Sequence, residues 1–123
     1  MCINQILIIA FRYAPEVLDR SDCNAYSKYS LQSDVWSYGV TLFEVFSRGK
    51  EPNLLTSSND SSWKAHANAL KAGSRLEKPD KCEQDIYKFI ILPCWEYNPN
   101  LRPKFSSILR NIIDFPRYNK AAE

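Results

Sequence analysis

The stretch from Val35 to Phe46 constrains the fold most, because its apolar residues fall on every side of a helix. A helix that is apolar all round is buried, either in a protein core or in a membrane. This one is shorter than the roughly 20 residues that a bilayer requires. We therefore expect it to be the central helix of a helical fold. Ser33 or Asp34 is a suitable N-cap residue, and Gly49 is a suitable C-terminal stop.

Four other segments show helical signals, and no segment shows the alternation of a strand. The helical segments are Pro15–Arg20, Ser61–Ala72, Glu83–Leu92 and a last helix that begins at Pro103. Pro15 and Pro103 suit the first turn of a helix, where a missing N–H costs nothing. We expect Pro93 to end or bend the third of these segments and Pro116 to stop the last one. The sequence thus predicts an all-α fold of about five helices.

Composition argues against a nucleic-acid-binding protein and against a membrane-spanning one. The net charge of +2 is too small to indicate nucleic acid as a partner. The apolar run Ile6–Phe11 is far below the length of a transmembrane segment, and no signal peptide is visible. The cysteines are scattered, which favours free thiols in a reducing compartment and a cytoplasmic protein; they are Cys2, Cys23, Cys82 and Cys94. We interpret the basic stretch around Lys71, Arg75, Lys78 and Lys81 as solvated.

Five short blocks follow one another along the chain. They are Phe11-Arg12-Tyr13-Ala14-Pro15-Glu16, the run from Ser33 to Glu44, the loop from Ala72 to Pro79, the pair Cys94-Trp95, and Arg102-Pro103. In this order and spacing they resemble the closing half of a protein kinase domain of the tyrosine-specific class, from the Ala-Pro-Glu motif onward. The sequence is most similar to the Janus kinases, with the Syk family second.

The resemblance implies a division of the chain and an incomplete fold. Residues 1–10 would be a lead-in that could reflect a false start, residues 11–115 part of the large kinase lobe, and residues 116–123 a tail. The parent domain would transfer the γ-phosphate of ATP to a protein tyrosine, with Mg²⁺ as its metal. Its partners would be protein substrates and, for this chain, the missing part of the kinase domain.

The resemblance also assigns roles to particular residues. Phe11, Arg12 and Tyr13 would dock the substrate, although Arg12 stands where tyrosine kinases usually carry tryptophan. Glu16 and Arg102 would form a buried ion pair; the alternative is two solvated surface charges. Asp34 would support the catalytic loop; because that loop is missing here, only the capping role that its residue type predicts can operate in this chain. The remaining motif residues would be structural, and they are Ala14, Pro15, Trp36, Gly39, Cys94, Trp95 and Pro103.

The parts that perform phosphoryl transfer are absent from the sequence. Its glycines are Gly39, Gly49 and Gly73, so no glycine-rich phosphate loop exists. His66 is followed by Ala67 instead of Arg-Asp, and Asp114-Phe115 is followed by Pro116. We therefore expect no catalytic residue, no ATP site and no metal site in this chain. Two alternatives to a kinase fragment stay open: a pseudokinase-like module that only binds proteins, and a non-functional truncated product.

Overall fold

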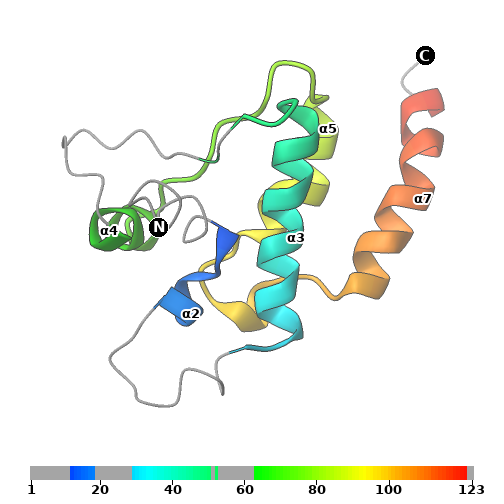
Figure 1. The fold of residues 1–123 in the computed structure, drawn as a ribbon. Coiled ribbons are helices and arrows are strands. Elements are labelled where there is room, and N and C mark those ends of the chain that lie inside the picture. The colour runs from blue at the N-terminus through cyan, green and yellow to red at the C-terminus, as the bar shows by residue number, and fades with distance from the viewer. Residues whose placement is uncertain (1–11, 19–28, 51, 53–62, 122–123) are drawn as a thin grey trace.

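The computed structural model describes residues 12–18, 29–50, 52 and 63–121, and these residues form helices and loops without a strand (Figure 1). The elements in chain order are α2 (Pro15–Leu18), α3 (Leu31–Phe46), α4 (Trp63–Lys71), α5 (Gln84–Ile86), the π-helix η2 (Tyr87–Ile91), α6 (Leu92–Cys94), the 3₁₀ turn η3 (Pro99–Leu101) and α7 (Phe105–Ala121). The prediction of an all-α fold is confirmed. Residues 19–20 and 61–62, which the sequence assigned to helices, lie outside the described residues.

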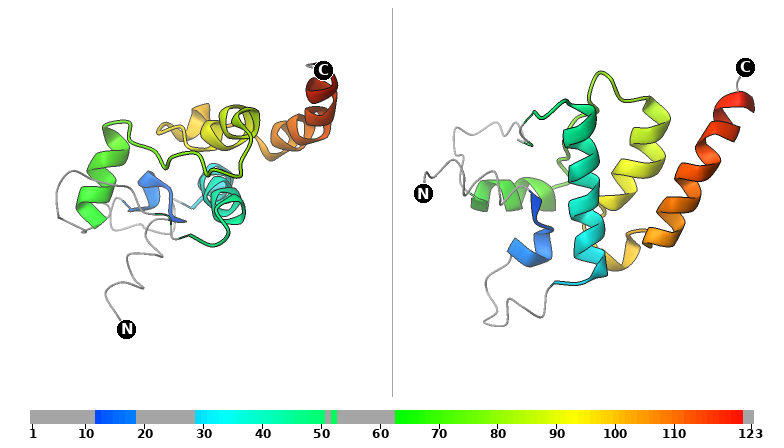
Figure 2. Two further views of the ribbon diagram at one scale, coloured as in Figure 1. Left: turned by 90° about the horizontal axis from the view of Figure 1, so that it is seen from above. Right: turned by 45° about the vertical axis from the view of Figure 1, so that its right-hand side comes forward.

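Helix α3 stands in the middle of the described elements. The continuous helix α5–η2–α6 lies along one side of α3, and α7 lies beyond it; α2 and α4 lie on the other side (Figures 1 and 2). The central position predicted for this segment is confirmed. Its buried residues are Ser33, Val35, Trp36, Gly39, Val40 and Phe43.

Burial of α3 is not complete, however. The side chain of Val45 is 65% exposed and that of Leu31 is 71% exposed. The expectation that the helix is covered on every side is therefore wrong for the described part of the chain. The reason is that its packing partners among the described residues occupy only part of its circumference, and apolar character alone does not say which neighbours are present.

The first turn of α3 corrects the predicted N-cap. The cap is Ser30, whose hydroxyl accepts from the Ser33 N–H at 3.2 Å, while the Ser33 hydroxyl accepts from the Ser30 N–H at 2.8 Å. These two bonds form a reciprocal capping box. Asp34 lies inside the first turn with an exposed side chain, so it caps nothing. The predicted C-terminal end of the helix at Gly49 is confirmed. Gly49 has a φ of +82°, and its N–H donates to the Glu44 carbonyl at 2.9 Å.

Two prolines behave differently from expectation. Helix α5–η2–α6 passes Pro93 and ends at Cys94, because the turn before the proline widens: the Leu92 N–H donates to the carbonyl of Tyr87, five residues back. The wider π turn accommodates a ring that crowds an ordinary α turn. Helix α7 begins at Phe105, two residues after Pro103, and continues through Pro116 to Ala121. The φ that proline imposes is compatible with a helix, so the cost is mainly one lost backbone hydrogen bond.

Candidate functional site

Glu16 and Arg102 lie in contact, although 86 positions separate them in the sequence. Nη1 of Arg102 donates to Oε1 of Glu16 at 2.6 Å, and Nη2 donates to Oε2 at 2.9 Å. The arginine side chain is fully buried, whereas that of Glu16 is 23% exposed. Two parallel hydrogen bonds between a guanidinium and a carboxylate fix the orientation of the two groups relative to each other.

The other donors of Arg102 are also used. Nε donates to the Glu96 carbonyl at 2.8 Å, Nη1 donates to the Gln32 carbonyl at 3.0 Å, and Nη2 donates to the Tyr97 carbonyl at 3.3 Å. A guanidinium has five N–H donors, so each one has an acceptor. Arg102 thus joins α2, the first turn of α3 and the turn after α6 at one point.

Trp36 extends this cluster to a second arginine. The guanidinium carbon of Arg102 lies 5.1 Å from the centre of the Trp36 ring, and that of Arg75 lies 5.4 Å from it. Arg75 also donates to the carbonyl of Trp95 at 2.8 Å and to that of Leu70 at 2.9 Å. Burial lowers the pKa of Arg75, and the positive charge of Arg102 also lowers it. The interpretation of Arg75 as a solvated residue was wrong. It rested on the neighbouring basic residues in the sequence, which do not reveal the contact of Arg75 with Trp36.

The segment predicted to dock the substrate, residues 11–13, is described from Arg12 onward; Phe11 lies outside the described residues. Nε of Arg12 donates to Oε1 of Glu44 at 2.9 Å, and Nη2 donates to Oε2 at 3.1 Å. The Ser37 hydroxyl donates to the Arg12 carbonyl at 2.9 Å. The ring of Tyr13 meets that of Tyr29 edge to face, with centroids 6.3 Å apart. The segment is therefore held along α3 by both its backbone and its side chains.

The remaining motif residues lie in the core or at its edge. Ala14, Pro15, Trp36, Gly39, Cys94 and Trp95 are buried, and Pro103 is half-buried. Cys94 contacts the α3 backbone at Gly39, and burial raises the pKa of its thiol to about 11. A thiol in that state is protonated and unreactive at neutral pH. Asp34, which its residue type assigned to capping and the resemblance assigned to supporting a catalytic loop, has an exposed side chain.

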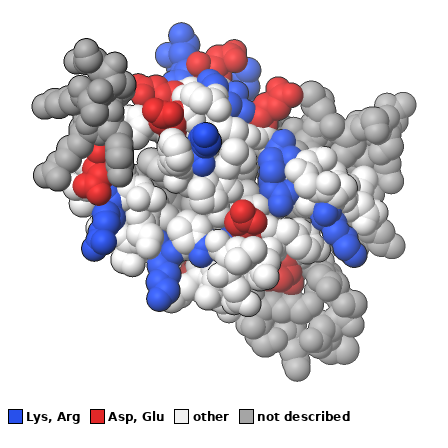
Figure 3. Space-filling model, turned by 180° about the vertical axis from the view of Figure 1, so that it is seen from behind, with Lys and Arg blue, Asp and Glu red and all other residues white. Residues whose placement is uncertain are grey.

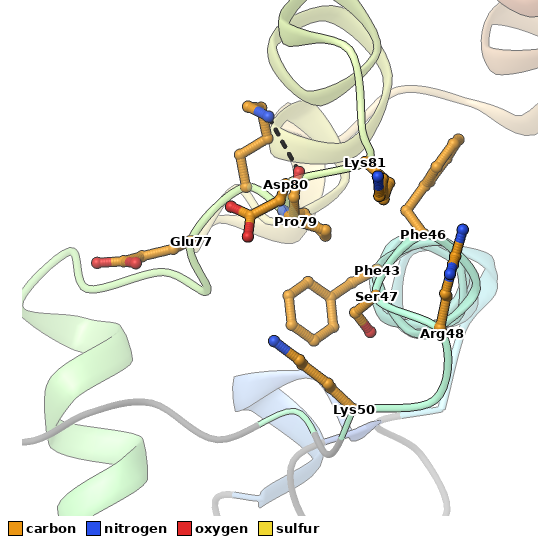
Figure 4. A pocket seen from close by; sticks show the side chains of 10 residues that line it. Phe43, Phe46, Ser47, Arg48, Lys50, Glu77, Pro79, Asp80 and Lys81 are labelled. Atoms are coloured by element: carbon orange, nitrogen blue, oxygen red, sulfur yellow. Dashed lines mark hydrogen bonds between the residues drawn. The ribbon is translucent and has the colours of Figure 1, made fainter.

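Two hollows open on the surface of the described residues. The larger, of about 460 Å³, lies between the end of α3 and the loop at residues 77–81 (Figure 4). Lys50 points toward its interior from one side, and Glu77 and Asp80 belong to the lining on the other side, so the lining has both signs of charge. A smaller hollow of about 360 Å³ lies between η2 and α7, with Phe89 and Phe115 in its lining.

Charge on the face opposite to the view of Figure 1 is equally mixed. Basic and acidic side chains are interspersed there, without a wide area of one sign (Figure 3). Among the residues that the structure describes, no group of three or more His, Cys, Asp or Glu could hold a metal ion. None of the described helices is both long enough and apolar enough to cross a membrane. The described site can hold distant segments of the chain together.

Comparison with known proteins shows which sequences this chain is similar to. The family model described as protein tyrosine and serine/threonine kinase matches residues 5–112. Tyrosine-protein kinase hopscotch of Drosophila melanogaster is 46% identical over 100 residues, which cover 79% of this chain and 8% of hopscotch. The tyrosine-protein kinase transforming protein Fps of avian sarcoma virus (strain PRCII) is 38% identical over 100 residues, covering 81% of this chain and 16% of that protein.

A human tyrosine-protein kinase is similar over a comparable part of the chain. Tyrosine-protein kinase Fer of Homo sapiens is 36% identical over 104 residues, which cover 85% of this chain and 11% of Fer. The chain therefore spans only a small fraction of the length of these curated relatives, between 8% and 16%.

Proposed function

Because the chain belongs to the protein tyrosine and serine/threonine kinase family, we propose that it is the substrate-docking and structural part of an active tyrosine kinase. In the protein that carries it, the γ-phosphate of ATP is transferred to a tyrosine of a protein substrate. The relatives reported above are tyrosine kinases, and hopscotch is a Janus kinase. The Janus-like subfamily is part of this proposal.

The observation that carries the proposal is the bonding of Arg102. All its donors are used, and two of them bind Glu16, the last residue of the Ala-Pro-Glu motif. A pair of this kind contributes little net stability but fixes geometry, because breaking it leaves a buried charge without a partner. The segment that begins at Arg12 enters α2 directly before Glu16, so the pair holds the docking segment in one position. Phosphoryl transfer depends on such positioning.

The chemistry of the transfer belongs to residues outside this chain. ATP and Mg²⁺ would be bound by the part of the kinase domain that precedes the docking segment, and the chain by itself binds neither. We propose a cytoplasmic location, which the two free and buried thiols of Cys82 and Cys94 support.

One observation favours a second candidate function. Arg12 replaces the tryptophan that tyrosine kinases usually carry in the docking segment, a departure that fits a kinase-like module which binds proteins without modifying them. Such a module would retain the Arg102 cluster, since that cluster maintains the fold, while its docking segment diverged.

Phosphorylation of peptides by the full-length protein that carries this chain separates the two candidates. The substrate is a tyrosine peptide incubated with ATP and Mg²⁺, and its control is the same peptide with phenylalanine in place of tyrosine. Transfer to the tyrosine peptide alone supports the kinase. Specific binding of a protein partner without transfer supports the binding module. The 123-residue chain should fail to bind ATP in isothermal titration, and binding would contradict the assignment.

A further inference from the structure

The ion pair between Arg12 and Glu44 leaves part of the arginine available. Glu44 occupies the edge of the guanidinium formed by Nε and Nη2. Both hydrogens of Nη1 and the second hydrogen of Nη2 have no acceptor among the described residues. These groups form the other edge of the planar fork, which can bind a second carboxylate through two parallel bonds. Half of the Arg12 side chain is exposed to solvent, compared with a quarter of Glu44.

The guanidinium is also held in place before any ligand arrives. Glu44 grips its side chain, and the Ser37 hydroxyl binds its backbone carbonyl at 2.9 Å. Ser37 and Glu44 are seven residues apart on α3, so they lie on the same face of that helix. The segment that contains Arg12 lies beside α3, close to the start of α2 (Figure 1). A cation fixed in this way loses little side-chain entropy on binding, which favours recognition.

The geometry points to a substrate class: we propose that Arg12 selects protein substrates with an aspartate or glutamate next to the target tyrosine. This inference rests on the proposed docking function of residues 11–13. The substrate carboxylate would bind the Nη1–Nη2 edge while Glu44 keeps the Nε–Nη2 edge. One guanidinium then bridges two carboxylates, and each acid has its own pair of donors. Tryptophan at this position would offer an apolar surface and a single donor, so it would give no such preference.

Binding of paired peptides to the 123-residue chain tests the proposal. Two labelled peptides differ only in having glutamate or glutamine on both sides of the tyrosine, and a scrambled peptide serves as the reference in fluorescence anisotropy. We expect the glutamate peptide to bind roughly threefold to fivefold more tightly at low salt, as for a half-exposed ion pair. The preference should shrink as ionic strength rises.

Variants separate recognition from a general effect of charge. Arg12→Gln should abolish the preference, and Arg12→Lys should leave an intermediate one, because lysine keeps the charge without the fork. Arg110→Gln is the matched control, since Arg110 is an exposed arginine of α7. It should leave the preference unchanged. A preference that persists in Arg12→Gln overturns the proposal.

A chimera keeps the test decisive if the chain alone binds weakly. In it, residues 5–112 replace the matching stretch of the Fer kinase, and kcat/KM is measured for both peptides. Binding of neither peptide by the chain, together with phosphorylation of neither by the chimera, overturns the proposed docking function. Equal use of both peptides in either assay leaves that function intact and overturns the selection by Arg12.

Discussion

Gly39 of α3 lies against the indole of Trp95 so closely that a methyl group at this position would come within 2.8 Å of Nε1 and within 2.9 Å of the Cβ of Cys94. Both contacts are shorter than van der Waals packing allows. The glycine therefore lets α3 approach the end of α6, and it does so through its size. Its φ is not in the left-handed region, unlike that of Gly49.

This difference predicts the effect of two alanine substitutions. Gly39→Ala should destabilise the protein by about 1–3 kcal/mol through overpacking. Gly49→Ala meets no atom within 4 Å, so it should cost only the roughly 1–2 kcal/mol of a left-handed backbone. Asparagine distinguishes overpacking from backbone strain. Compared with alanine, it should be less destabilising at position 49, where it tolerates the left-handed backbone, and more destabilising at position 39, where it is larger. Chemical denaturation measures all four variants, and the same order at both positions would argue against this account.

Replacement of Arg102 by lysine should be the most damaging conservative change in the chain. The charge is retained, but the fork that binds Glu16 is lost, and breaking a buried pair costs about 3–5 kcal/mol. The matched control is Arg12→Lys, which alters a half-exposed pair of the same type and should cost below about 1 kcal/mol. Similar losses for the two variants in urea unfolding would show that Arg102 contributes no more than a surface pair.

The capping of α3 can be tested at two neighbouring positions. Ser30→Ala removes the hydroxyl that accepts from the Ser33 N–H, and it should cost about 1 kcal/mol. Asp34→Ala removes only the favourable interaction of an exposed carboxylate with the helix dipole, which amounts to a few tenths of a kcal/mol. Thermal unfolding monitored by circular dichroism gives both values. A larger loss of stability for Asp34→Ala than for Ser30→Ala would show that Asp34 is the N-cap residue.

His66 should make stability fall in mild acid. Burial lowers its pKa from 6.5 to about 4, so between these values the unfolded chain binds a proton that the folded chain does not. The folded state is therefore most stable above pH 6.5 with respect to this group, and it loses on the order of 3 kcal/mol of stability as the pH falls toward 4. Comparison with His66→Gln over this range isolates the effect from the carboxylates. Parallel curves for the two proteins would contradict it.

The chain should associate in solution through apolar side chains on α7 and α3. Leu109 is 58% exposed and Ile113 61% on α7, and Val45 is 65% exposed on α3; exposed apolar surface of this kind favours association. Sedimentation velocity over a range of concentrations measures it. The double variant Leu109→Glu/Ile113→Lys should reduce the apparent mass, whereas Lys104→Glu, an exposed charge change just before α7, should not. A monomer at every concentration would show that these side chains are tolerated in water.

Much of the secondary structure could be predicted because its signals are local. The apolar run of α3 and the glycine after it are read from neighbouring residues, and the structure confirms both. Prolines were harder to interpret. Pro93 and Pro116 lie inside helices, because a widened turn or a lost hydrogen bond is tolerated when the surrounding helix is otherwise favourable.

Local signals predicted a helical protein with the segment from Val35 at its centre, and the motifs predicted both the resemblance to a tyrosine kinase and the pair of Glu16 and Arg102. The partners of two other arginines follow only from the way the chain packs. Arg75 contacts the same Trp36 ring as Arg102, and Arg12 pairs with Glu44, for which the resemblance gave no partner. The physical reason is that helix propensity and capping depend on residues within a few positions, whereas an ion pair depends on how distant segments pack. No local pattern distinguishes a buried arginine from a solvated one.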